Sequence, residues 1–512
     1  MKRGIAAIIT CLLVSTPSFS VTLHVPSQYP TIRAGINAAQ DYDTVLVAAG
    51  GYYEHIDFLG KEIVVKSESG AELTAIVWAG QENVVTMNSG EGAVLEGFTI
   101  QNDYPGDMAG CGIYCGPGSW PTIGNNRIIE CGSIWCQPGG GISAWSASPH
   151  IEDNLIAGNM CAYYGAGIQL SQCFDVVIRD NVIANNYTAS GYGVAVGGGI
   201  YADSSEGLIE RNLFVANIAD PDYGYGGAIA VAGSGWCQIW RNTFSENVSG
   251  MNNYPTGGGI CLGPQWGCSA SIFFEDNILV NSSQGGGFSL YGGTPILRLD
   301  FNDVWNNQPF NYYGCTPGPF DISADPLFEG GSPYSYELTA NSPCVDAGSF
   351  MANPDPDGTR ADIGAYPFNR VGMNVSFQPY FWPINIPANG GWFAGHFFLT
   401  NNTASSSHFD FWVDVMLPDS SVFGPLILRR NLTFSPEQQI MRAMVQNIPG
   451  GAPAGNYFYR SHTGIYQIGQ IFCETAMPFT KLGVSGSDGR WTIQGDLADW
   501  GETRQLPDLP KD

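Results

Sequence analysis

The stretch GGGISAWSASPHIEDNLIAGN, residues 139–159, carries a pattern that the chain repeats in successive segments. Each copy opens with glycine followed by isoleucine, and an asparagine followed by apolar residues comes about a dozen residues later. The isoleucine positions are Ile113, Ile142, Ile168, Ile200, Ile229 and Ile260, with Phe288 in the same place in one further copy. The asparagine positions are Asn126, Asn154, Asn181, Asn212, Asn242, Asn277 and Asn302, and a second series contains Asn159, Asn186, Asn217, Asn247 and Asn307, with Ser282 in one copy.

This repeat predicts a parallel β-helix, in which each coil supplies short strands that pair with the coils above and below. An asparagine at each sharp corner can adopt a left-handed conformation and bond its neighbours along the stack. The residues two places after the isoleucine position should point inward, and all are apolar or small: Cys115, Ala144, Leu170, Ala202, Val231, Leu262 and Leu290. The alternative is an antiparallel sandwich with coincidental Asn-Gly turns, which does not account for so many copies in register.

The segment before the repeats predicts a cap. Ile32, Ile36 and Ala39 share one face of a short helix over residues 33–40. Such a helix would cover the open end of the stack, which otherwise exposes bare strand edges.

The domain boundaries follow from these patterns. We assign residues 21–370 to the β-helix, including the N-terminal helical cap and a C-terminal cap. In residues 371–483 the repeat vanishes, and alternating apolar positions predict a small β-sandwich. Residues 484–512 form a polar tail in this assignment.

The first residues predict export. Lys2 and Arg3 precede an apolar run, and a small-residue stretch ends at Ser20, which is the pattern of a signal peptide over residues 1–20. We therefore expect a secreted or cell-surface protein. A lipoprotein anchor at Cys11 is the alternative, which Thr10 disfavours. No later segment approaches the roughly 20 unbroken apolar residues of a membrane span.

The composition narrows the partners. A formal net charge of −26 argues against nucleic acid, whose phosphates bind Lys and Arg. Of the 13 cysteines, Cys11 falls in the signal peptide, and in an exported protein the others are expected to pair in part. Cys111 and Cys115 lie close together, as do Cys131 and Cys136, and Cys315 and Cys344 flank one candidate end cap, but the sequence leaves the connectivity open. Cys473 stands alone and predicts a free buried thiol.

Several segments together resemble a known group of proteins. Residues 29–39 with Gly51-Tyr52-Tyr53-Glu54 look like the start of pectin methylesterases, and residues 325–366 look like the choice-of-anchor end of exported bacterial proteins. Over about residues 22–368 the chain resembles the bacterial right-handed parallel β-helix proteins of the pectin-lyase-like superfamily. The resemblance implies the fold but no reaction, since one fold hosts many activities.

The outward side of the Gly-Ile strands would form the groove in which related enzymes bind polysaccharide. We expect glycan contact there, because aromatic rings about 4.8 Å apart on successive coils can stack on sugar rings. The expected glycan-binding residues are Tyr114, Trp145, Gln169, Tyr201, Asp203 and Tyr291 on the strands, with Tyr192 and Tyr225 on the loops before them. The alternative is that these aromatics only pack against neighbouring loops.

Catalytic residues are harder to find. A glycoside hydrolase needs two carboxylates about 5–9.5 Å apart, and the groove row offers only Asp203, the best candidate. A lyase needs a base such as Lys or Arg, but no Lys occurs between Lys66 and Lys481. Arginines near the repeat asparagines share their coils with acidic residues, so stacked ion pairs explain them more simply. The motifs of pectin methylesterases and polygalacturonases are missing.

We expect no cofactor apart from calcium. Asp355, Asp357 and Asp362 could bind Ca²⁺ through oxygen ligands, although a turn held by carboxylate-to-amide bonds explains the same spacing. The leading hypothesis is a monomeric exported protein that binds polysaccharide or a cell-surface glycan without catalysis. The alternatives are a polysaccharide lyase or glycoside hydrolase acting on acidic polysaccharide, and a structural surface protein.

Overall fold

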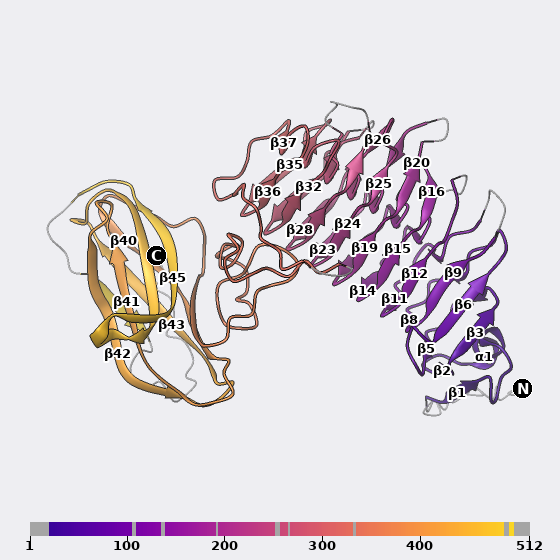
Figure 1. The fold of residues 1–512 in the computed structure, drawn as a ribbon, viewed down its shortest axis with the longest axis horizontal. Helices are drawn as coiled ribbons and strands as arrows, with labels where there is room; N and C mark the ends of the chain where they lie inside the picture. Colours follow the sequence, from indigo (N-terminus) through magenta and orange to yellow (C-terminus); the bar gives the residue numbers. More distant parts are fainter. Residues whose placement is uncertain are drawn as a thin grey trace, which may run out of the picture.

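A computed structural model describes residues 20–104, 109–134, 139–190, 193–250, 256–264, 267–330, 334–485 and 491–495. In these residues the chain winds into a parallel β-helix of about nine turns and then forms an antiparallel β-sandwich (Figure 1). The predicted fold class is confirmed. No described helix is long and apolar enough to cross a membrane.

Three parallel sheets run along the β-helix, and each complete coil contributes one strand to each of them. Sheet 1 carries the Gly-Ile strands: β4 (Ile56–Asp57), β7 (Val85–Met87), β10 (Ile113–Cys115), β13 (Ile142–Trp145), β17 (Ile168–Ser171), β22 (Ile200–Asp203), β27 (Ile229–Ala232), β31 (Ile260–Leu262), β34 (Phe288–Leu290) and β37 (Tyr312–Tyr313). Sheet 2 contains β1 (Thr22–Val25), β2 (Thr44–Val47), β5 (Val64–Ser67), β8 (Val94–Glu96), β11 (Thr122–Gly124), β14 (His150–Glu152), β18 (Val176–Arg179), β23 (Gly207–Glu210), β28 (Trp236–Trp240), β32 (Ser271–Glu275) and β35 (Ile296–Asp300). Sheet 3 contains β3 (Gly50–Tyr53), β6 (Thr74–Trp78), β9 (Thr99–Asn102), β12 (Arg127–Ile129), β15 (Leu155–Ala157), β19 (Val182–Ala184), β24 (Leu213–Val215), β29 (Thr243–Ser245), β33 (Ile278–Val280) and β36 (Asp303–Trp305).

Short strands extend some coils outside the three sheets. One group follows sheet 3 and consists of β16 (Met160–Ala162), β20 (Tyr187–Ala189), β25 (Ile218–Ala219) and β30 (Val248–Ser249). A second group is the pair β21 (Ala195–Val196) and β26 (Gly224–Tyr225), which lies in the loops that lead back to sheet 1.

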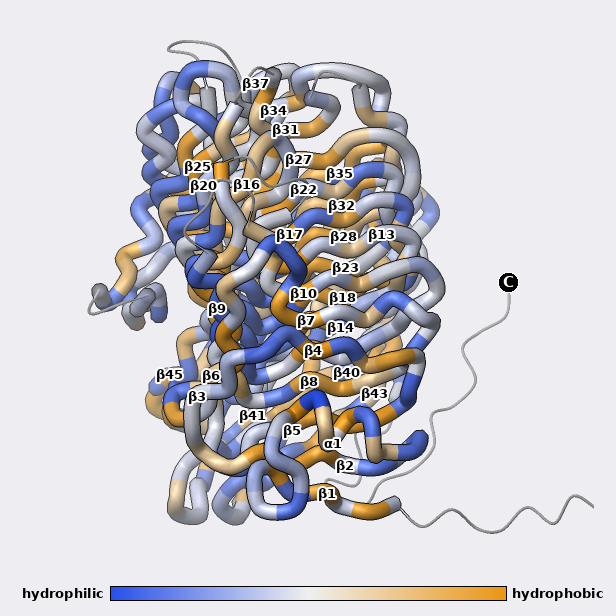
Figure 2. Tube along the Cα trace, turned by 90° about the vertical axis from the view of Figure 1, so that its right-hand side faces the viewer, coloured by the Kyte–Doolittle hydropathy of each residue, from blue (hydrophilic) through white to orange (hydrophobic). Residues whose placement is uncertain are grey.

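The strand register explains the repeat in the sequence. Ile113, Ile142, Ile168, Ile200, Ile229, Ile260 and Phe288 stand opposite one another on neighbouring strands of sheet 1. These seven side chains are fully buried, and apolar positions recur coil after coil along the stack (Figure 2). The positions two residues later also face this core, as period-two alternation predicts.

Two asparagine ladders fix the corners between the sheets. Asn154 is typical: its Oδ1 accepts the backbone N–H of Asn126 at 2.9 Å, and its Nδ2 donates to the Ile123 carbonyl at 2.8 Å. The ladder asparagines themselves do not take the left-handed conformation, so that part of the prediction is wrong. The preceding residue takes it, as at Asp153 with a φ of 56°. The turn is made there because the asparagine side chain must point inward to bond along the stack.

The N-terminal end is capped as the sequence predicts. Helix α1 (Ile32–Ala38) buries Ile32 and Ile36 against the first coils. Thr31 and Glu54 accept the free amides at its start, with Glu54 accepting from Ile32 at 2.8 Å. Lys61 Nζ donates to three carbonyls at its end. Glu54, part of the segment that looks like a methylesterase, therefore has a capping role here.

The cysteines differ from the expectation. Cys115, Cys173, Cys237, Cys261, Cys268, Cys315, Cys344 and Cys473 are free thiols. The expected partial pairing is therefore wrong for Cys115, Cys315 and Cys344. Cys115 points into the core, and the Cys344 thiol donates to Asp303 Oδ2 at 3.3 Å. The predicted buried free thiol at Cys473 is confirmed, whereas Cys11 and Cys136 lie outside the described residues.

The C-terminal part is a sandwich of two sheets that share one core. One sheet contains β38 (Met373–Pro379), β40 (Gly390–Asn401), β43 (Gln439–Pro449) and β46 (Thr492–Gly495). The other contains β39 (Asn385–Ile386), β45 (Gln470–Lys481), β44 (Gly455–Ile465), β41 (Ser407–Met416) and β42 (Val422–Phe434), with a short 3₁₀ helix at Tyr466–Ile468. Strand β46 lies beyond residue 483, where the sequence prediction begins the polar tail.

The sandwich packs on the C-terminal cap of the β-helix. The Trp382 ring lies 4.5 Å from the Phe350 ring, and Phe350 lies 5.7 Å from Phe301. The Arg360 guanidinium stands 3.7 Å from the centre of the Phe350 ring. Arg241 of the β-helix donates to the Asn353 carbonyl of the cap at 2.6 Å. The β-helix, cap and sandwich thus share one continuous interface.

Candidate functional site

The outward side of sheet 1 carries two aligned rows. In the first, Tyr114, Ser143, Gln169 and Tyr201 stand on successive strands. In the second, Trp145, Ser171, Asp203 and Ala232 stand on successive strands. The predicted site residues on the strands therefore lie on one face, separated by the strand spacing of about 4.8 Å.

Loops cover the middle of the first row. Gln169 is 6% exposed and Tyr201 is 5% exposed. Tyr164 stacks on Tyr201 with 5.2 Å between ring centres, and Val196 of β21 joins the same apolar cluster. Burial raises the pKa of the Tyr201 hydroxyl. Gln169 and Tyr201 therefore support packing beneath the loops, and the structure does not present them to a polymer.

Three of the other predicted tyrosines, Tyr114, Tyr225 and Tyr291, are less deeply buried. The Tyr225 and Tyr291 rings meet edge to face at 4.8 Å, and their hydroxyls lie 3.2 Å apart. Tyr291 is 41% exposed, whereas Tyr225 is half-buried. Tyr114 is half-buried on its strand. Tyr192 lies outside the described residues.

Three exposed aromatic side chains lie near the turn from sheet 1 to sheet 2. Trp120, Trp145 and Phe174 belong to three consecutive coils and are 52%, 48% and 51% exposed. We call these three residues the aromatic corner. The backbone holds the coils in register there, since Ser148 donates its N–H to the Ser119 carbonyl and Phe174 donates to the Ala147 carbonyl.

A glycine gives one of these rings its place. A Cβ at Gly92 would lie 2.1 Å from Trp120 Nε1, so the indole occupies the space that a side chain would need. The strand positions of the repeat predict Trp145 as a site residue but not Trp120 or Phe174. Trp120 and Phe174 stand in the turns between a Gly-Ile strand and the next strand. Large aromatic residues in these turns are the sequence signal that indicates them.

Acidic residues continue the same edge toward later coils. Asp203 lies two strands beyond Trp145 in the second row. Its Oδ1 accepts the Ser204 hydroxyl at 3.0 Å. Glu206 and Asp175 stand in the neighbouring turns. The edge therefore combines open ring faces with hydrogen-bond acceptors, a mixture that suits polar ligands with apolar faces.

The arginines of the β-helix are occupied by acids. Arg179 lies 2.6 Å from Glu152, Arg211 lies 2.8 Å from Asp180, and Arg298 pairs with Glu275. Ion pairs also join Arg127 to Glu72 and Arg241 to Asp355. The stacked ion pairs expected from the sequence are therefore present.

The three aspartates of the predicted calcium site accept backbone amides. Asp357 Oδ1 accepts from Thr359 at 2.9 Å, Asp355 Oδ2 accepts from Asp362 at 2.7 Å, and Asp362 Oδ1 accepts from Asp346 at 2.6 Å. Among the described residues no group of three acidic, histidine or cysteine side chains is arranged to hold a metal ion. Calcium binding at this turn stays a prediction, and the carboxylate-to-amide alternative matches the bonds present.

Comparison with known proteins bears on the fold. Residues 63–244 match the family described as the right-handed β-helix region, which supports a right-handed coil. Among solved structures, the chain is similar to full-length tailspike protein 2 of Escherichia coli O157:H7 bacteriophage CAB120, at 10% identity and a TM-score of 0.20. The match covers 88% of this chain and 65% of the tailspike, so the chain spans less than two thirds of that protein. No curated protein matches the chain.

Proposed function

We propose that this chain is an exported β-helix protein that binds polysaccharide along the aromatic corner. The observation that carries the proposal is the exposure of Trp120, Trp145 and Phe174 on three consecutive coils. Large exposed rings cost solvation free energy, and several of them on neighbouring coils of a rigid scaffold are typical of a binding surface. Stacked coils space the rings along the solenoid axis, which suits an extended polymer.

The charge of the chain limits the ligand. With a net charge of −26 the protein repels nucleic acid and anionic membrane surfaces. Export is part of the proposal and rests on the signal-peptide pattern of residues 1–20. We also propose that the chain is related to the pectin-lyase-like superfamily and that its β-helix has a choice-of-anchor end. The first rests on residues 29–39 and 51–54, and the second on residues 325–366.

The test is retention of the purified chain in gels that contain polysaccharide. Uronic-acid and neutral polysaccharides are compared with and without Ca²⁺, and products are sought by mass spectrometry. We expect retention without products. A Trp120→Ala/Trp145→Ala/Phe174→Ala variant should lose most of that retention, because ring contacts contribute roughly 1 kcal/mol each. Tyr53→Ala, which removes an exposed ring from β3 far from the corner, is the matched control.

The other outcomes would change the proposal. Cleavage products that disappear in Asp203→Asn would make the protein a hydrolase and replace the binding function. Retention that the triple variant leaves intact would place binding elsewhere. Neither retention nor products would favour a structural surface role.

A further inference from the structure

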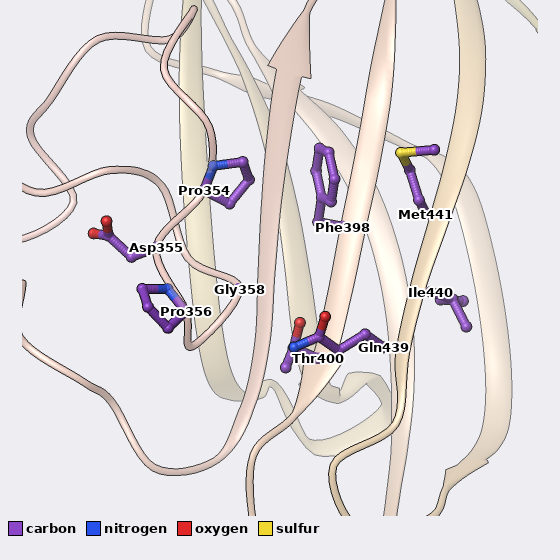
Figure 3. Close-up of a pocket in the computed structure, with 9 residues that line it drawn as sticks. All are labelled: Pro354, Asp355, Pro356, Gly358, Phe398, Thr400, Gln439, Ile440 and Met441. Atoms are coloured by element: carbon purple, nitrogen blue, oxygen red, sulfur yellow. The ribbon is translucent and has the colours of Figure 1, made fainter. Parts of the chain in front are cut away.

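A second concave site lies between the C-terminal cap and the sandwich. Residues 354–358 of the cap and strands β40 and β43 enclose a cleft of about 430 Å³ (Figure 3). This volume is within the range of small-molecule sites, which occur preferentially at domain interfaces. The cleft lies in a different part of the molecule from the aromatic corner.

The walls of the cleft are apolar. Phe398 and Met441 are cross-strand partners on the outer face of the sheet, and Pro354 and Pro356 of the cap face them (Figure 3). Phe398 is half-buried and Met441 is 53% exposed. The ring and the flexible thioether therefore form an adaptable apolar wall that water reaches.

One end of the cleft is polar and uncharged. Thr400 and Gln439 are the next cross-strand pair on the same face and lie together at that end (Figure 3). Thr400 is 3% exposed and packs against Gly358, so the exposed Gln439 supplies the accessible polar group. The Asp355 carboxyl also borders the cleft but points away from the strands, and it accepts the Asp362 amide at 2.7 Å. None of the described lining residues is Lys or Arg.

Further aromatic side chains lie along β40 outside the cleft. Trp392, His396 and Phe398 alternate with core residues and share the outer face of this strand. The His396 ring lies 5.0 Å from the Tyr380 ring, and the Tyr380 hydroxyl lies 3.2 Å from His396 Nε2. Burial lowers the pKa of His396, which favours the neutral ring. The strip therefore offers ring faces and neutral hydrogen-bonding groups.

We infer that this cleft binds the neutral sugar rings of an oligosaccharide. A pyranose has an apolar C–H face for Phe398 and Met441, and hydroxyl groups that the exposed Gln439 amide can bind. An acidic ligand would bring its charge into an acidic protein without a lining cation. The inference does not depend on the aromatic corner, since it rests on residues of the cap and sandwich alone.

The test uses the full-length chain carrying Trp120→Ala/Trp145→Ala/Phe174→Ala, so that the cleft is measured by itself. Calorimetric titrations compare neutral cellohexaose, mannohexaose and chitohexaose with anionic hexagalacturonate. We expect at least one neutral hexaose to bind at one site per chain, and hexagalacturonate to bind more weakly.

Added to this chain, Phe398→Ala should weaken hexaose binding by about tenfold or more. Gln439→Ala removes an exposed side chain and should weaken it severalfold while leaving thermal unfolding unchanged. Phe423→Ala, an exposed phenylalanine of β42 on the other sheet, is the matched control and should bind like the parent. The inference is overturned if no neutral hexaose binds, if hexagalacturonate binds more tightly, or if Phe398→Ala and Gln439→Ala leave affinity unchanged.

Discussion

Asp321 Oδ1 accepts both the backbone N–H and the Nδ2 group of Asn302, at 2.8 and 3.1 Å. On every earlier rung of this ladder the acceptor is the Oδ1 of the next asparagine. After Asn302 the repeat ends, and a carboxylate from the cap takes that place. Its Oδ2 accepts the Tyr312 hydroxyl at 2.7 Å and the Gly318 amide at 2.8 Å.

Asp321→Ala should lower the free energy of unfolding by about 2–4 kcal/mol, because four donors near the last coil lose their acceptor. Asp321→Asn keeps an oxygen for Asn302 and should cost less than half as much. Urea unfolding followed by circular dichroism measures both. Asp325→Ala, which removes one amide contact in the same cap, is the control. Equal losses for the two Asp321 variants would contradict the acceptor role.

The second ladder has a gap that a single substitution can test. Ser282 stands where the other coils have asparagine, and its backbone N–H donates to Asn307 Oδ1 at 3.0 Å. Ser282→Asn should restore the missing acceptor for the coil below and raise stability by about 0.5–1.5 kcal/mol. An asparagine side chain should fit at residue 282. In the next coil Gly287 leaves room for the Asn307 side chain, and Gly259 is the equivalent glycine in the coil of Ser282.

Urea unfolding measures this change. The urea midpoint should rise, while the slope of the unfolding free energy against urea concentration stays constant. Asn217→Ala is the opposite control, since it breaks an intact rung and should destabilise. A destabilised Ser282→Asn chain would mean that the corner is too tight for the larger side chain.

Local patterns of the sequence were sufficient for the repetitive part of the fold. Ile142 and Asn154 recur at fixed places in each coil, so their roles follow from spacing alone. The burial of Tyr201 could not be predicted, because it depends on loops of irregular length that fold back over sheet 1. The ring of Trp145 is 48% exposed, and none of the described loops covers it. The cleft at Phe398 depends on how two domains pack, which no local pattern encodes.

Asp276 should make the stability of the contact between the β-helix and its C-terminal cap depend on pH. Burial raises the pKa of its carboxyl to about 7, although Arg241 and Arg360 favour the charged form. The unfolded value is about 3.9, so the native state binds the proton more tightly. The contribution to stability is therefore complete below about pH 4 and is lost as pH rises through about 7. For this group alone the loss is up to about 4 kcal/mol.

Asp276→Asn should flatten that dependence, since the amide keeps an acceptor for Ser349 without titrating. Thermal unfolding of both chains at pH 5 and pH 8 gives the difference. Some slope should remain, because burial also raises the pKa of Asp355 to about 7. The same slope in both chains would show that Asp276 does not titrate in this range.

His462 should give the sandwich a pH dependence of its own. Its ring nitrogens lie 3.2 Å from Asp414 and 3.0 Å from Glu474, and its ring stacks on Trp412 at 4.8 Å. Burial opposes protonation, but the two carboxylates raise the pKa of His462 above its ordinary value. The pKa of each carboxyl is lowered in turn. At Asp414 burial acts to raise the pKa, but His462 and Arg460 outweigh it. At Glu474 the main cause of the lowered pKa is the contact with His462.

The directions of these pKa shifts define the pH range in which the cluster stabilises the sandwich. The raised pKa of His462 gives stability that is present below about pH 6.5 and is lost as pH rises through the folded value. The lowered carboxyl values give stability that is present above about pH 4 and is lost as pH falls further. The cluster should therefore stabilise the sandwich most between about pH 4.5 and 6.5.

His462→Gln keeps the size of the side chain but cannot carry the charge, so calorimetry from pH 4 to 9 should show the maximum removed or reduced. His408→Gln, an exposed histidine on β41, should leave it in place. A maximum that survives in His462→Gln would mean that the two carboxylates are held by Arg460 and solvent alone.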